Sequence, residues 1–224
     1  SRLLALENTH NAGGGTVWPL DRLAAVAAVG RELGLSLHLD GARLWNAAAA
    51  LGVAPAAIAA PVDSVSVCFS KGLGAPVGSA LAGSAELITR ARRFRGLFGG
   101  AMRQVGIIAA GALFALETNR ERLAVDHARA RALAEGLARQ DVFAVDTDRV
   151  QTNMVMADVR GVDAASLVEA ASAKGVRFLA FGPQRLRFVT HLDLPEDAVE
   201  RTLGVIGEVL TGLPRHDPAP SGAA

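Results

Sequence analysis

The strongest constraint on the fold is an alternation of apolar, β-branched segments with segments of helical periodicity. The segments at 3–7, 35–40 and 64–70 predict buried strands. One helix is expected to begin at Pro19, because proline favours the first helical turn, and another to run from about 43 to 51. Strands that alternate with helices are typical of an α/β fold with a mainly parallel sheet, which is the class we expect.

The pattern changes after a fourth expected strand at 77–82. Residues 84–98 and about 103–139 favour long helices. Three further strands are expected at 150–156, 176–181 and 185–189, with helices at about 163–174 and after Pro195. Short strands grouped with helices in this way predict a smaller α+β C-terminal domain.

We therefore divide the chain into four parts. They are the C-terminal part of a large domain at 1–118, a connecting helix at 119–140, a small α+β domain at 141–213 and a tail at 214–224. The tail is rich in proline, alanine, serine and glycine, and we expect it to be disordered. The chain begins without methionine, directly in an apolar strand, so we expect a fragment whose N-terminal part is absent.

Composition excludes several classes of protein. The chain has 23 basic and 22 acidic residues, so neither a nucleic acid nor an anionic membrane is an expected partner. No apolar stretch is long enough to predict a transmembrane helix. The single cysteine, Cys68, excludes an internal disulfide framework and favours a reducing, cytoplasmic compartment. The five histidines are scattered without ligand spacing, so we expect no metal site.

The chain has only two lysines, Lys71 and Lys174, against twenty-one arginines. Arginine serves where charge alone matters, so a retained lysine is a candidate for amine chemistry. Lys71 ends an expected strand and precedes small residues, a setting that we expect to desolvate the amine and favour its neutral, nucleophilic form. The alternative is a glycine-rich turn whose lysine reaches solvent. The segment matches neither a phosphate-binding P-loop nor a dinucleotide fingerprint.

Asp40 lies at the end of another expected strand and is followed by Gly41. It could cap the next helix, or it could present a carboxylate to a ligand cation such as the ring nitrogen of pyridoxal. His38 shares its strand face, where a hydrogen-bonded core histidine is the more common role. His10 follows the first expected strand and is a candidate base. Ligands bind at the carboxyl ends of strands in open α/β sheets, so His10, Asp40 and Lys71 are expected near one another.

Two arginine-containing segments complete the candidates. The glycine turn at 99–104 leads into an expected helix, and Arg103 at its N-terminus suits a phosphate. In the last expected strand, alternation puts Arg185, Arg187 and His191 on one face and apolar residues on the other. An arginine on such a face suits bidentate binding of a carboxylate. A solvated surface arginine is the alternative in both segments.

Five segments together resemble L-threonine aldolases, which are fold-type I pyridoxal-phosphate enzymes. They are Glu-Asn-Thr-His-Asn at 7–11, Asp-Gly-Ala-Arg at 40–43, Ser-Lys-Gly-Leu-Gly-Ala-Pro-Val-Gly at 70–78, Gly-Gly-Ala-Met-Arg-Gln at 99–104 and Arg-Phe-Val-Thr-His at 187–191. One such segment is weak evidence, but five in this order are specific, and the resemblance covers nearly the whole chain apart from the tail. It implies part of a mainly parallel large domain together with the small α+β domain of such an enzyme.

The resemblance implies roles for the cofactor-binding positions. Lys71 would hold pyridoxal 5'-phosphate covalently, with Ser70 beside it, and Asp40 would pair with the pyridinium nitrogen. Arg43 would lie near the ring oxygen of the cofactor and the substrate carboxylate. Arg103 would reach a cofactor phosphate in the neighbouring subunit, because the family forms homodimers or homotetramers with shared active sites.

The resemblance also implies a substrate and a reaction. Arg187 would bind the carboxylate of a β-hydroxy-α-amino acid, with Arg185 as the second choice, and His10 would face the β-hydroxyl. The implied reaction is cleavage of L-threonine or L-allo-threonine to glycine and acetaldehyde. Two alternatives stay open: a related fold-type I enzyme that catalyses β-elimination or transamination, and a non-catalytic fragment or oligomerising domain. The family's N-terminal phosphate-binding segment and ring-stacking histidine are missing here, so weak cofactor binding is expected of this chain alone.

Overall fold

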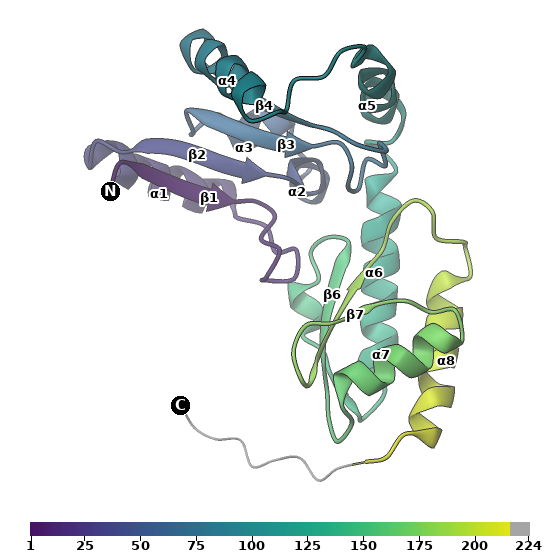
Figure 1. Ribbon diagram of the computed structural model, residues 1–224. Coiled ribbons are helices and arrows are strands. Elements are labelled where there is room, and N and C mark those ends of the chain that lie inside the picture. The colour runs from purple at the N-terminus through teal and green to yellow at the C-terminus, as the bar shows by residue number, and fades with distance from the viewer. Residues whose placement is uncertain (216–224) are drawn as a thin grey trace. The chain divides into compact units, whose positions relative to one another are not determined.

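The computed structural model describes residues 1–215 and divides the chain into two compact units (Figure 1). Unit 1 runs from Ser1 to Ala124, and unit 2 begins at Val125. Helix α6 (Leu123–Ala138) contains the division. Most of the tail that we expected to be disordered lies outside the described residues.

Unit 1 is built on a four-stranded sheet with the order β1-β2-β3-β4. The strands β1 (Leu3–Glu7), β2 (Ser36–Gly41) and β3 (Ser64–Cys68) are parallel, and β4 (Ser79–Gly83) pairs antiparallel with β3. The arrowheads of the three parallel strands point the same way in Figure 1. The expected α/β fold with a mainly parallel sheet is therefore confirmed.

Five helices accompany this sheet in unit 1. They are α1 (Leu20–Glu32), α2 (Leu44–Leu51), α3 (Pro55–Ala59), α4 (Ala85–Leu97) and α5 (Gly106–Thr118). The short α3 was not expected from the sequence, although Pro55 occupies its first turn. The long helix expected at about 103–139 is interrupted: α5 ends at Thr118, and Asn119 uses its side-chain amide to bind the carbonyl of Leu73.

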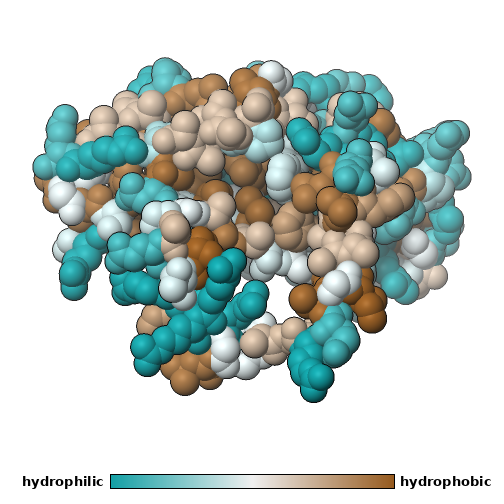
Figure 2. Space-filling view, turned by 90° about the horizontal axis from the view of Figure 1, so that it is seen from above, coloured by the Kyte–Doolittle hydropathy of each residue, from teal (hydrophilic) through white to brown (hydrophobic). Residues whose placement is uncertain are grey.

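Unit 1 leaves many large apolar side chains on its surface around β4, α4 and α5. The exposed ones are Leu81, Phe94, Leu97, Phe98, Met102, Val105, Ile107, Leu113 and Phe114. Helix α4 buries none of its residues, and all five residues of β4 are exposed. Figure 2 looks onto this side of unit 1, where brown apolar side chains lie among teal hydrophilic ones. Large apolar side chains exposed together on one part of a surface are typical of a face that another protein surface covers.

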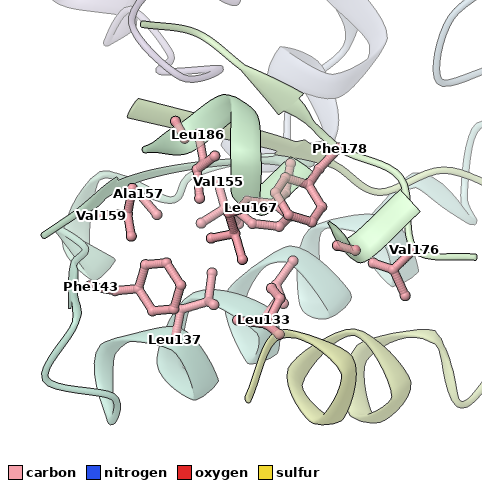
Figure 3. Close-up of a cluster of buried hydrophobic side chains, with 14 of the residues drawn as sticks. Leu133, Leu137, Phe143, Val155, Ala157, Val159, Leu167, Val176, Phe178 and Leu186 are labelled. Carbon is pink, nitrogen blue, oxygen red and sulfur yellow. The ribbon is translucent and has the colours of Figure 1, made fainter. Parts of the chain in front are cut away.

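Unit 2 contains a second, antiparallel sheet with the order β5-β6-β8-β7. Its elements are α6, β5 (Phe143–Ala144), a 3₁₀ turn at Thr147–Arg149, β6 (Met154–Val159), α7 (Ala164–Ala173), β7 (Leu179–Ala180), β8 (Arg185–Val189) and α8 (Ala198–Gly212). Apolar side chains from the sheet and from α6 and α7 form its core, as Figure 3 shows for Leu137, Phe143, Val155 and Leu167. The strand expected at 176–181 is reduced to the two residues of β7.

Burial of His127 in α6 predicts a pH-dependent stability. Burial lowers the pKa of His127 from 6.5 to about 4. Between these values the unfolded chain binds a proton that the folded chain does not, so the free energy of unfolding should fall as the pH drops from 6.5 towards 4. The side chain is partly exposed, so we expect a loss of about 2 kcal/mol rather than the full linkage of about 3 kcal/mol.

Urea unfolding at several pH values measures this effect. The His127→Gln variant, which cannot take up a proton, should lose less stability than the wild type over the same interval. An identical slope in the two proteins would show that His127 is not the group responsible.

Candidate functional site

The three parallel strands of unit 1 end at the same edge of the sheet. The register pairs Glu7 with Asp40, and Asp40 with Ser66, so these residues lie side by side across β1, β2 and β3. The segments that follow the strands carry His10, Arg43 and Lys71. The structure thus brings the sequence candidates of unit 1 to the carboxyl edge of the sheet, where open α/β sheets bind ligands.

Asp40 is exposed at this edge, and its role as a helix cap is excluded. Its Oδ1 accepts a hydrogen bond from the backbone N–H of Ala42 at 3.0 Å, whereas the residue at the N-cap of α2 is Arg43. The carboxylate is therefore held in a tight local turn at the sheet edge. His38 makes a 2.8 Å hydrogen bond with the Ser64 hydroxyl through Nδ1, which agrees with the structural role expected for it.

His10 lies in a compact loop after β1. The carboxylate of Glu7 accepts the backbone N–H of Asn11 at 3.0 Å through Oε1, and its Oε2 lies 3.7 Å from Nε2 of His10. The side chain of His10 is 50% exposed, so its ring is accessible to a ligand. A Cβ on Gly13 would lie 2.7 Å from Nδ1 of His10, so glycine is needed there to leave the ring in place.

Lys71 follows β3 in a tight turn and is exposed. The expectation that its amine is desolvated is therefore wrong for this chain, because the turn carries the side chain out to solvent. The Lys71 carbonyl accepts the N–H of Gly74 at 2.8 Å, and Gly74 has a φ of 76°, a conformation that favours glycine. Ser70, the neighbouring candidate, is exposed as well.

Two side chains that sequence reasoning missed hold this turn. Nε1 of Trp45 donates to the carbonyl of Cys68 at 3.3 Å, and Nδ2 of Asn119 donates to the carbonyl of Leu73 at 2.8 Å. No local pattern links either residue to Lys71, because the contacts span 23 and 46 positions of sequence.

Arg103 is exposed and lies between α4 and α5. The expected helix begins later than predicted, at Gly106, so Arg103 precedes the helix rather than lying in its first turn. Arg103 does not follow any of the parallel strands β1, β2 and β3, so their register does not place it near the other candidates of unit 1.

Strand β8 of unit 2 carries the two candidate carboxylate-binding arginines. Leu186 and Phe188 are buried while Arg185 is exposed and Arg187 is half-buried, so the alternation expected from the sequence is confirmed. Arg185 donates from Nε and one terminal nitrogen to the two oxygens of Asp158, at 2.7 and 2.9 Å. This hydrogen bonding, together with the charge of Asp158, raises the pKa of Arg185.

Arg187 has different surroundings. Its guanidinium lies 5.3 Å from the centre of the Phe181 ring. The third member expected on this face, His191, lies beyond the end of β8, with Nδ1 3.6 Å from a carboxylate oxygen of Asp193. Arg185, on the same strand, is engaged by the carboxylate of Asp158.

Residues 1–215 contain neither a candidate membrane-spanning helix nor a candidate metal site. No described helix combines the length and apolar character needed to cross a membrane. In the same residues, no group of three or more histidine, cysteine, aspartate or glutamate side chains is placed to hold a metal ion.

Comparisons with known proteins agree with this arrangement. A sequence model of the beta-eliminating lyase family matches residues 1–160. Low-specificity L-threonine aldolase 1 of Arabidopsis thaliana is 38% identical over 213 residues, covering 94% of this chain and 60% of the relative. The low specificity L-threonine aldolase of Escherichia coli K12 is 43% identical over 197 residues, covering 88% of this chain and 57% of the relative.

A solved structure gives the same fold. Leishmania major threonine aldolase aligns with a TM-score of 0.75 at 20% identity, covering 93% of this chain and 61% of that one. The chain spans about 60% of the length of the curated relatives named above.

Proposed function

We propose that this chain, which belongs to the beta-eliminating lyase family, is part of a pyridoxal-phosphate-dependent aldolase that cleaves L-threonine or L-allo-threonine to glycine and acetaldehyde. The observation that carries the proposal is the register of the parallel strands: Asp40 pairs with Glu7 and Ser66 at one edge of the sheet, and the segments that carry His10 and Lys71 follow β1 and β3 at that edge. An amine, a carboxylate and an imidazole at that edge are the groups that this chemistry requires.

The residues at the edge fit pyridoxal phosphate chemically. Lys71 offers an exposed primary amine for covalent attachment to an aldehyde. Asp40 offers a carboxylate whose Oδ2 has no hydrogen-bond partner among residues 1–215, so it can accept a protonated ring nitrogen. When bound, the cofactor would supply an electron sink for breaking the bond between Cα and Cβ of the substrate.

His10 is our candidate for the group that handles the β-hydroxyl proton. Its Nε2 lies 3.7 Å from Oε2 of Glu7, and the half-exposed ring is accessible to the hydroxyl of a bound substrate. We assign Arg43 and Ser70 to cofactor binding at the same edge, and Arg43 also to the substrate carboxylate. Arg103 is assigned to a cofactor phosphate in a neighbouring subunit.

Arg187 is our candidate for binding the substrate carboxylate. A planar guanidinium can donate two parallel hydrogen bonds to a carboxylate, which fixes the orientation of the substrate as well as its position. Arg185 already makes this bidentate contact with Asp158, and it would have to break that pair in order to bind a ligand. The Asp158 pair therefore counts against Arg185 as the residue that binds the substrate carboxylate.

We further propose a homodimer or homotetramer with shared active sites, located in the cytoplasm. The exposed apolar residues around β4, α4 and α5 support the assembly, because they give unit 1 a surface suited to burial against a second subunit. A hollow lined by Leu81 of β4, Phe94 of α4 and Phe98, which follows α4, lies within this surface.

The test is to supply residues 1–224 with pyridoxal phosphate and L-threonine and to analyse the products. We expect glycine and acetaldehyde, at a turnover at least about 100-fold below that of the Escherichia coli relative, because the chain spans only part of that protein's length. Turnover equal to that of the relative would show that the extra length is dispensable. Ammonia with a keto acid in place of acetaldehyde would favour a β-eliminating enzyme, and failure to bind the cofactor at all would contradict the proposal.

A further inference from the structure

The segment that carries Lys71, residues 69–75, is a tight turn that we call the Lys71 loop. Within it, the N–H of Gly74 donates to the Lys71 carbonyl at 2.8 Å, and the N–H of Ala75 donates to the Phe69 carbonyl at 3.0 Å. Among the described residues, the Lys71 amine itself has no hydrogen-bond or ion-pair partner. The backbone of the loop therefore fixes the position from which the flexible Lys71 side chain extends.

Two side chains from elsewhere in unit 1 fasten that backbone on either side of Lys71. Trp45 of α2 donates from Nε1 to the carbonyl of Cys68, three residues before Lys71, at 3.3 Å. Asn119, which follows α5, donates from Nδ2 to the carbonyl of Leu73, two residues after Lys71, at 2.8 Å. Each bond gives a backbone carbonyl beside Lys71 a donor from a side chain that is distant in sequence.

The side of the loop that faces the interior of unit 1 is closely packed, so the loop has little freedom to move away from these two bonds. Leu73 is 1% exposed and packs in a cluster with Ala112 and Ala115 of α5. A Cβ on Gly72 would lie 2.9 Å from Oδ1 of Asn46, so the loop has no room to settle deeper. Packing of Leu73 and Gly72 against unit 1, together with the two hydrogen bonds, therefore opposes displacement of the loop.

The ring of Trp45 is steadied in turn by Arg120, whose guanidinium lies 5.9 Å from the ring centre. Asn119 and Arg120 are neighbours, so the short segment after α5 supports both fastening points. Both contacts therefore depend on the turn between α5 and α6, which carries Asn119 and Arg120.

We propose that Trp45 and Asn119 are positioning residues that hold the Lys71 loop so that the Lys71 amine meets the cofactor aldehyde in a productive geometry. The inference rests on the proposed function, because Lys71 needs such alignment only if it binds an aldehyde. Covalent attachment is sensitive to small displacements of the reacting atoms, so loosening either contact should slow it.

The test uses variants that each remove the donor of one hydrogen bond, and Asn119→Asp also places a carboxylate oxygen against the Leu73 carbonyl, which adds repulsion to the loss of the bond. Asn119→Asp keeps the shape of the side chain and loses the N–H donor, and Trp45→Phe keeps an aromatic ring and loses the indole N–H. Thr89→Ala is the matched control, because the Thr89 hydroxyl donates to the carbonyl of Ala85 within α4 at 2.8 Å and makes no bond to Asn119 or to the loop. All are made in the Lys174→Arg background, in which Lys71 is the only lysine.

Two measurements read the outcome. Amide hydrogen exchange at Gly74 and Ala75 should be about tenfold faster in Asn119→Asp and Trp45→Phe, and unchanged in Thr89→Ala. Borohydride trapping of pyridoxal phosphate on Lys71 should be about tenfold slower in the same two variants. Labelling of Lys71 by trinitrobenzenesulfonate, which needs only an accessible amine, should stay within about twofold, and this separates misalignment from unfolding.

The proposal is overturned if the exchange rates of Gly74 and Ala75 are unchanged in both variants, or if the cofactor is trapped at the wild-type rate. Loss of the fold in both variants also overturns it, because the contacts would then support the unit rather than the loop. A parent chain that traps no cofactor on Lys71 contradicts the proposed function instead. In that case amide exchange still decides whether the two side chains hold the loop.

Discussion

Replacing Lys71 by alanine should abolish covalent attachment of pyridoxal phosphate and leave no measurable cleavage of threonine. The proposed chemistry needs a primary amine at the end of β3, and the chain has only one other lysine, Lys174. Lys71→Arg should fail in the same way, because a guanidinium stays protonated and does not attack an aldehyde. Borohydride trapping followed by peptide mass spectrometry measures the attachment directly.

The fold should survive both substitutions. Lys71 is exposed, and substitutions at such positions change the free energy of unfolding by about 0.5 kcal/mol or less. Lys174 provides the control, since its Nζ is paired with Glu208 at 2.7 Å in unit 2. Lys174→Ala should keep the attachment at Lys71. Trapping of the cofactor on Lys174 in the Lys71→Ala protein would contradict the assignment.

The strands that position the candidate site could be predicted because their signals are local. The segments at 3–7, 35–40 and 64–70 are apolar runs that match β1, β2 and β3 within two residues at each end. Parallel pairing of neighbouring strands then brings their carboxyl ends together, and the candidates that follow them come with it. The faces of β8 could be predicted for the same reason, because alternation along a strand is a property of adjacent residues.

Contacts between distant segments could not be predicted in this way. The periodicity of the sequence predicts one helix from about 103 to 139, but α5 ends at Thr118. The next residue, Asn119, donates from its side-chain amide to the carbonyl of Leu73. The exposure of Lys71 depends on the path of its loop, not on the apolar strand before it. The pairing of Arg185 with Asp158 depends on the register of β8 against β6, which no local pattern contains.

That pairing makes the two arginines of β8 a matched test of substrate binding. We expect Arg187→Ala to weaken binding of L-threonine to the cofactor-loaded protein far more than it weakens binding of the cofactor. Loss of a bidentate, charge-assisted contact should cost about 2–4 kcal/mol in kcat/KM, because the carboxylate loses both its partner and its orientation. Binding of pyridoxal phosphate should change by less than about threefold, since its proposed contacts lie in unit 1.

Arg185→Ala is the control, and it should change KM for threonine by less than about threefold. Its guanidinium is held by Asp158, and both side chains are about half exposed, so breaking this pair costs little stability. Steady-state kinetics of the two variants, together with cofactor titration, separates the expected outcomes. If Arg185→Ala shows the larger loss in kcat/KM, the face of β8 is correctly assigned to the substrate and the choice of Arg187 is wrong. If neither variant changes KM, the carboxylate is bound elsewhere, and Arg43 at the edge of the parallel sheet becomes the residue to replace.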